Sequence, residues 1–200
     1  VLKSAQITKG RSNLRGKFSL HFKGKGKYKK APLLMSADFK IFRGYVEDLQ
    51  NIIPMNPSSG AMDVIKSLPL SGAIEGRVKF SGNIAGGRTR FMTGEGRLFN
   101  KTGTRLLRQG LTHWSAAFDL NKDAFELTKF QGVMGGGKIG TQLVVLRDEG
   151  SISGTLDLKN VRLSQLDINR ELPQSLLGQL NFEGTIKGQA KNPLVTGKTT

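Results

Sequence analysis

The chain has 200 residues, with 31 Lys or Arg against 15 Asp or Glu, 26 glycines and no cysteine. The absence of cysteine excludes a disulfide framework, a thiolate metal site and a cysteine nucleophile. No apolar run reaches the length of a membrane-spanning helix, and the net charge of +16 favours anionic partners over cationic ones.

The positive charge is concentrated at the start of the chain. Residues 1–30 contain ten basic side chains and no acidic one, so the other 170 residues contribute only +6 (16 − 10). A basic segment of this kind attracts polyanions such as nucleic acid, anionic lipid headgroups or lipopolysaccharide. The alternative is a solvated strand face with a lysine-rich loop that protects an exposed sheet edge from aggregation.

The first seventy residues predict three strands and two short helices. Apolar and polar side chains alternate in residues 1–30, interrupted by a basic loop, and again in residues 33–46. Residues 46–53 have helical spacing, and residues 61–67 predict a second short helix that ends before Pro69.

From Ser71 onward the sequence is almost entirely β in character. We expect strands near residues 72–84, 88–99, 112–120, 124–133, 138–147, 151–159 and 178–190, and a further short helix within residues 163–172. No Pro/Ser-rich linker divides the chain, which predicts one continuous segment made of units 1–70, 71–172 and the start of a third at 173–200. The first residue is Val1, and the sequence ends in a strand-like stretch, so we expect a piece of a longer protein.

One short motif occurs twice, 102 residues apart. The copies run from Gly76 to Ile84 and from Gly178 to Ile186; each follows a Leu-Pro pair and precedes a Thr-Gly step. Both copies alternate strictly, which places their apolar side chains on one face of a strand. Repeated strand units that cannot bury an apolar face alone are typical of arrays, so the motif favours an extended binding surface over an enzyme.

Three stretches together resemble the AsmA-like superfamily of bacterial envelope proteins, and TamB-type proteins in particular. They are VMGGGKIGTQLVVL, ISGTLDLKNVRLSQLDI and LPQSLLGQLNFEGTIKGQAKNPLVTGK. In the last stretch the family pattern is matched by Leu172, Pro173, Gly178, Leu180, Gly184, Pro193 and Gly197. The first copy departs from it, having Arg88-Thr89-Arg90 where the second has Asn192-Pro193. The likeness covers most of residues 33–200.

This resemblance implies a mainly β fold: a long, curved antiparallel sheet, called a β-taco, with an apolar groove and short inserted helices. It also implies a non-enzymatic, cofactor-free periplasmic segment of a protein anchored in the inner membrane. Its roles there would be lipid transport and outer membrane biogenesis, with phospholipid as ligand. TamB-type proteins are further implicated in protein translocation and assembly with an outer-membrane barrel partner.

The sequence predicts which side chains would contact a lipid. Nine apolar residues of the predicted strands would line the groove: Ile74, Val78, Phe80, Ile84, Trp114, Phe118, Leu180, Phe182 and Ile186. Four lysines of the basic segment would contact anionic headgroups: Lys17, Lys23, Lys25 and Lys27. The alternative is an ordinary closed sandwich in which the same apolar positions pack on one another.

Other chemistries find little support in the residues. The run from Gly132 to Lys138 approaches a phosphate-binding loop, but Ile139 replaces the required hydroxyl residue and a strand pattern follows, so we expect a turn or bulge. His21 and His113 are isolated in strand patterns, which predicts no metal site. We expect no nucleic-acid binding, because the aromatic residues near the N-terminus share a parity that the lysines do not occupy.

Overall fold

The structure is a computed structural model that describes residues 2–9, 12–22, 33–49, 70–85, 88–100, 104–106, 109–147, 149–166 and 177–200. They form one antiparallel sheet of twelve strands with only two short helical turns. The strands are β1 (Leu2–Lys9), β2 (Ser12–Phe22), β3 (Leu33–Tyr45), β4 (Leu70–Ala85), β5 (Arg88–Asn100), β6 (Thr104–Leu106), β7 (Gln109–Leu120), β8 (Ala124–Met134), β9 (Gly137–Leu146), β10 (Ser151–Arg162), β11 (Gln179–Gln189) and β12 (Asn192–Thr199).

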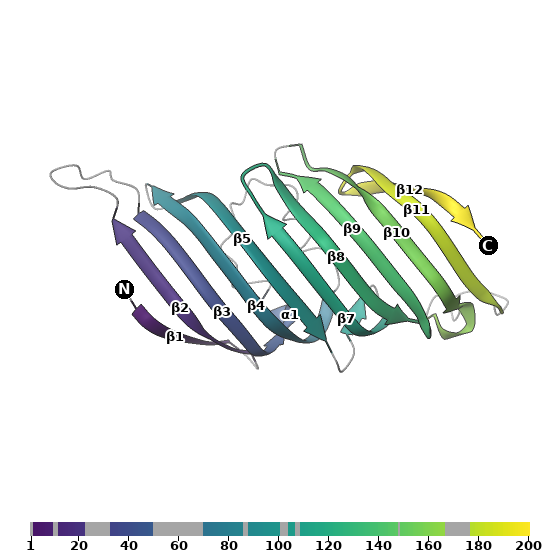
Figure 1. The fold of residues 1–200 in the computed structure, drawn as a ribbon, viewed down its shortest axis with the longest axis horizontal. Helices are drawn as coiled ribbons and strands as arrows, with labels where there is room; N and C mark the ends of the chain where they lie inside the picture. The colour runs from purple at the N-terminus through teal and green to yellow at the C-terminus, as the bar shows by residue number, and fades with distance from the viewer. Residues whose placement is uncertain are drawn as a thin grey trace.

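The order of strands in space follows their order in the chain. Each strand pairs with its sequence neighbours, except that β5 pairs with β7 while the short β6 pairs with β4 and β7. Figure 1 shows the consequence: the colour changes steadily across the sheet, and the two termini lie at opposite ends of it. The sheet is open, because β1 and β12 are its two ends and do not pair with each other. The predicted mainly β class, with an antiparallel sheet and short helices, is confirmed.

The strand predictions are close to the observed bounds, and the helix predictions are borne out only in part. Helix α1 (Val46–Leu49) follows β3 directly, and a 3-10 turn, η1 (Leu163–Gln165), follows β10. The rest of the predicted helix at 46–53, the one at 61–67 and most of the one at 163–172 lie outside the described residues, as do both Leu-Pro pairs. The sequence did not predict β6, and it indicated β12 only as a strand-like stretch.

The glycine run between β8 and β9 is a two-residue hairpin turn. Gly135 and Gly136 have φ angles of 56° and 71°, a combination that β-branched or bulky residues rarely adopt and that matches the twist of the flanking strands. Because Gly137 begins β9 rather than a helix, the expected turn is confirmed and no helix N-terminus faces this loop.

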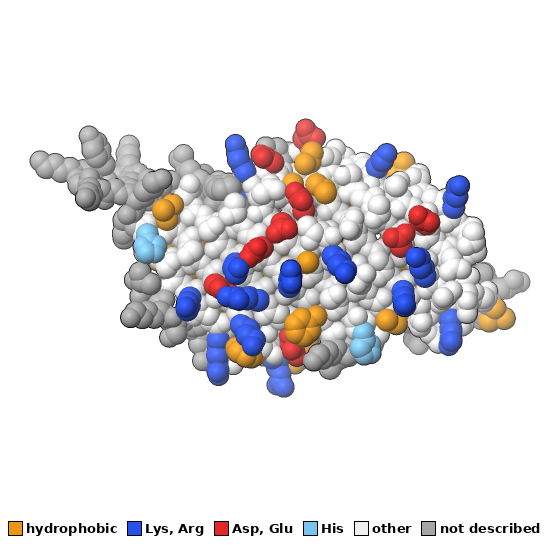
Figure 2. Space-filling view, in the orientation of Figure 1, with side chains coloured by type: hydrophobic (Ala, Val, Ile, Leu, Met, Phe, Trp, Pro, Cys, Tyr) orange, Lys and Arg blue, Asp and Glu red, His pale blue; other side chains and the backbone are white. Residues whose placement is uncertain are grey.

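The sheet has two chemically different faces. Residues that lie directly opposite each other in neighbouring strands share a face, so each face can be followed strand by strand through the pairing register. One face, here called the apolar face, carries three rows that cross from β2 to β12 and consist almost entirely of aliphatic, aromatic and glycine residues. The opposite face, here called the polar face, carries the charged and hydroxyl side chains of the same strands (Figure 2).

The most buried part of the apolar face lies over the central strands. Eight side chains from β2, β3, β4, β7 and β9 form one cluster, each at most 9% exposed: Leu14, Phe39, Ile41, Ile74, Val78, Leu111, Trp114 and Ile139. A smaller cluster joins Val145 to Ala190. Most other apolar residues of this face, including those of β11, are half-buried; Leu120 is buried and Val195 of β12 is exposed.

Candidate functional site: the apolar face

The predicted groove residues gather on one face. A single row of directly opposed positions contains Val78 on β4, Phe118 on β7 and Ile186 on β11, with Gly96, Leu127, Leu143 and Gly154 between them. Phe80 lies in the adjacent row, opposite Gly94. The structure describes the side chains of eight of the nine predicted residues; that of Ile84 lies outside the described residues.

These eight residues differ in how much solvent reaches them. Ile74, Val78 and Trp114 are buried at 5%, 8% and 8% exposure and belong to the central cluster. Phe80 and Phe118 pack against that cluster and are half-buried, as are the three residues of β11: Leu180, Phe182 and Ile186. The more accessible part of the predicted set is therefore Phe80, Phe118 and the three residues of β11, while Ile74, Val78 and Trp114 belong to the core.

The aromatic rings of this face lie over glycines. A Cβ atom on Gly94 would come within 2.4 Å of the Phe80 ring, and one on Gly96 within 2.4 Å of the Phe118 ring. The same holds for Phe39 over Gly16, at 2.7 Å. A ring can lie flat on the sheet only where the residue beneath it has no side chain. The glycines therefore let these rings lie directly on the backbone.

This arrangement explains why the repeated motif includes a Thr-Gly step. In the first copy Phe80 covers Gly94, and in the second Phe182 covers Gly197, where an added Cβ would lie 2.7 Å from the ring. Each copy thus places its phenylalanine on the glycine of the following strand. The first glycine of each copy also has the same backbone character, with φ of 150° at Gly76 and 111° at Gly178. The sequence showed the repetition, but not this contact between the phenylalanine and the glycine of the paired strand.

Trp114 has a polar atom that the core leaves without a partner. Its ring stacks on Phe130 with centroids 6.1 Å apart, and its side chain is 8% exposed. The indole Nε1–H is buried without a hydrogen-bond acceptor in the described part of the chain. An unpaired buried donor costs free energy, so this nitrogen lowers the stability of the core.

The four predicted headgroup lysines are placed only in part. Lys17 is exposed on the polar face of β2, opposite Asp38 of β3. Lys23, Lys25 and Lys27 lie outside the described residues. Phe18, the aromatic neighbour of Lys17, is on the apolar face and packs against the central cluster, as the alternation predicted.

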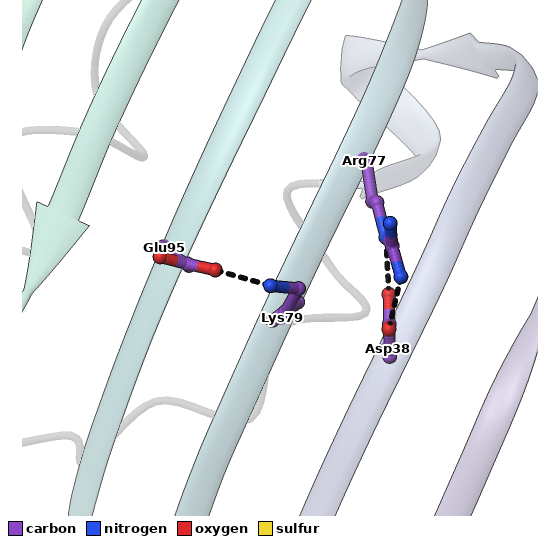
Figure 3. Close-up of polar contacts among 4 residues, drawn as sticks. All are labelled: Asp38, Arg77, Lys79 and Glu95. Atoms are coloured by element: carbon purple, nitrogen blue, oxygen red, sulfur yellow. Dashed lines mark hydrogen bonds and ion pairs between the residues drawn. The ribbon is translucent and has the colours of Figure 1, made fainter.

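The polar face is ordered into rows by the same register. One row crosses neighbouring strands and carries charges of both signs, and its members are Lys17, Asp38, Lys79, Glu95 and Asp119. Two ion pairs involve this row (Figure 3). Lys79 and Glu95 are both members of it, with Nζ 2.5 Å from Oε1. Arg77, from the adjacent row, donates two hydrogen bonds to Asp38, at 2.7 and 2.5 Å. The hydrogen bond from Arg77 lowers the pKa of Asp38, and that from Lys79 lowers the pKa of Glu95.

A second row on this face consists of hydroxyl side chains. Ser19 and Ser36 hydrogen bond across β2 and β3 with oxygens 2.5 Å apart, and Ser81 and Thr93 do so across β4 and β5 at 2.7 Å. An open hollow of about 1050 Å³ lies over these two rows. Phe18, Ala37, Phe80 and Leu120 also line it, so the hollow combines charged and hydroxyl groups with apolar surface.

The described residues contain no group of three or more His, Asp or Glu that could hold a metal ion. His21 and His113 are both exposed, and His113 sits in a bulge of β7 with φ of 49°.

No helix in the described residues is long and apolar enough to cross a membrane. Among known proteins, no family model, curated protein or solved structure matches the chain significantly.

Proposed function

We propose that the chain is a non-enzymatic, lipid-binding segment of an AsmA-like, TamB-type envelope protein, in which the apolar face holds phospholipid acyl chains. The single observation that carries the proposal is the open apolar face: three apolar rows cross the sheet from β2 to β12 without the sheet closing on itself. The central cluster of this face is already buried, so the part that still needs a cover is its half-buried part, which includes β11. In an ordinary sandwich a second sheet supplies such a cover, and within the described residues there is only one sheet.

The chemistry of the face favours acyl chains as that cover. Burying apolar surface is worth about 25 cal/mol per Å², and each buried methylene about 0.8 kcal/mol. The rings of Phe80, Phe118 and Phe182 lie over glycines and offer acyl chains apolar surface without a polar group that would fix one chain in place. Such a surface would hold acyl chains of different lengths and allow them to slide, as transport between membranes requires.

The setting is part of the same proposal. The segment would lie in the periplasm, carried by a parent protein anchored in the inner membrane, and would contribute to lipid transport and outer membrane biogenesis. The support is the family resemblance of residues 33–200 together with the open antiparallel architecture that this resemblance predicted.

Native mass spectrometry of the purified chain, with lipid extraction of the same sample, tests the proposal. We expect co-purified phospholipid of mixed chain length, because the apolar rows offer contact area across the sheet. A lipid-free mass after mild purification would contradict the proposal and would indicate that the apolar face is covered by the protein itself.

A second candidate function, assisting assembly of outer-membrane proteins, is favoured by strand β12, whose outer edge has no partner strand among the described residues. All eight residues of β12 are exposed, including Leu194 at 65% and Val195 at 45%. An unpaired strand at the end of a sheet can bind an incoming strand by β-augmentation. A barrel protein of the outer membrane would supply such strands.

Proline substitution separates the two functions. Successive N–H groups of a strand point to opposite sides, so of Val195→Pro and Thr196→Pro one removes an outward N–H and leaves the pairing with β11 intact. If the edge binds strands, that variant loses binding of an unfolded barrel-strand peptide at least tenfold, measured by fluorescence anisotropy, and retains lipid. Unchanged peptide binding in both variants would remove β12 from consideration.

A further inference from the structure

Four basic side chains on the polar face are aligned across neighbouring strands. Arg15 of β2 lies opposite Lys40 of β3, Lys40 opposite Arg77 of β4, and Arg77 opposite Arg97 of β5. All four are exposed. Adjacent strands are about 4.8 Å apart, so this basic row spans about 14 Å. Only Arg15 belongs to the basic segment 1–30 that the sequence related to polyanions; Lys40, Arg77 and Arg97 lie outside it.

The basic row is unfavourable for folding. Like charges directly opposite each other in a sheet repel and destabilise the pairing. Among the four cations of the row, Arg77 forms an ion pair with Asp38 in the described residues. Glu95, which pairs with Lys79, also attracts Arg97 and Arg77 electrostatically, and Glu75 lies opposite Phe99. These contacts offset the repulsion only in part, and the four cations keep an excess of positive charge that favours an anionic partner.

Phe42 adds an exposed apolar group to the basic row. It is 49% exposed, and a register shift in β3 between Ile41 and Gly44 places it beside the row. Lys40 Nζ lies over its ring, 4.8 Å from the centroid, and Arg15 Cζ lies 5.8 Å from it. These cation–π contacts hold the two cations together around an apolar group. In Figure 2 basic and hydrophobic side chains occur together along the lower border of this face.

An anionic membrane surface fits this combination better than nucleic acid does. Single strands bind to aromatic rings on which bases can stack, but the ring of Phe42 already carries two cations. Aromatic and basic side chains side by side are typical of proteins that bind at the lipid–water interface, where the ring enters the headgroup layer and the cations meet anionic lipids.

The geometry points to a membrane-docking surface on the polar face, formed by Arg15, Lys40, Phe42 and Arg97, that binds anionic phospholipid bilayers. The apolar face would hold extracted acyl chains, whereas this surface brings the sheet to the bilayer without extracting a lipid. Arg77 is left out because Asp38 already neutralises it. The surface does not depend on the proposed lipid carriage, and the two can fail separately.

The test compares two triple variants of equal charge change in a vesicle co-sedimentation assay. R15Q/K40Q/R97Q removes the unpaired cations of the basic row; K138Q/K187Q/K198Q removes three exposed lysines from β9, β11 and β12. With vesicles of phosphatidylglycerol and phosphatidylcholine, we expect the first variant to lose about 100-fold in partition coefficient, because attraction falls several-fold with each cation removed. The control should lose less than about fivefold, and pure phosphatidylcholine vesicles should bind neither protein.

Thermal unfolding and lipid extraction keep the result interpretable. The first variant should unfold at the same temperature as the parent chain or a higher one, because repulsion in the row is relieved, and it should keep any lipid bound on the apolar face. F42S should weaken vesicle binding with no change in net charge. Equal losses in both triple variants, a marked drop in unfolding temperature, or a loss of single-stranded DNA binding with vesicle binding unchanged would each overturn the proposal.

Discussion

Phe182→Glu is expected to abolish phospholipid binding while the sheet stays folded. Phe182 lies on the apolar face of β11, half-buried and outside the central core cluster, with its ring over Gly197. A carboxylate there would have to lose its hydration when acyl chains cover the face. We expect affinity for phospholipid to fall about 100-fold or more, equivalent to about 2.8 kcal/mol. Lipid extraction and native mass spectrometry measure the loss directly.

Thr185→Glu is the matched control for this variant. It introduces the same charge on the same strand, but Thr185 is exposed and lies on the polar face. Circular dichroism should show unchanged β content in both variants, and only Phe182→Glu should lose lipid. If both variants keep lipid, the acyl chains bind elsewhere on the sheet; if both lose it, charge rather than the apolar face governs binding.

The sequence predicted the strands well because their alternation is long and regular. The pattern from Ile74 to Phe80 sets both the strand and its buried face, and the register preserves that face through every neighbouring strand. The same pattern could not predict that Ile74, Val78 and Trp114 are core residues whereas Phe182 is accessible. Burial depends on which strands surround a position, and alternation does not report a position's distance from the sheet's centre.

The basic row was missed for a related reason. In the sequence the concentration of lysine in residues 1–30 dominates, while Arg15, Lys40, Arg77 and Arg97 are scattered over more than eighty residues. Their alignment follows from the pairing of four strands, and long-range register cannot be read from one sequence without knowing which strands pair. The sequence also could not predict the register shift in β3 beside Phe42, because a bulge adds a residue without a distinctive composition.

Gly76→Ala is expected to destabilise the sheet strongly, although it adds only one methyl group. Gly76 has φ of 150°, and a Cβ atom on it would lie 2.1 Å from the backbone carbonyl oxygen of Arg97 on the neighbouring strand. A backbone atom cannot move aside as a flexible side chain does, so the pairing of β4 with β5 would have to open locally. We expect a loss of about 3–5 kcal/mol in the free energy of unfolding, measured by urea denaturation.

Substitutions at two other glycines separate the two causes of this loss, which are backbone strain and the steric clash with β5. Gly178, at the corresponding position of the second motif, has φ of 111° but nothing within 4 Å of an added Cβ, so Gly178→Ala should show backbone strain alone, about 1 kcal/mol. Gly110 is exposed, with open space around an added Cβ, so Gly110→Ala should change stability by less than about 0.5 kcal/mol. Equal losses at Gly76 and Gly178 would mean that strain, and not the close approach of β5, fixes glycine in the motif. The ordered series Gly110, Gly178, Gly76 would instead show that the first copy lies in the tightly paired interior of the sheet and the second near its open end, where the glycine is kept for its backbone conformation.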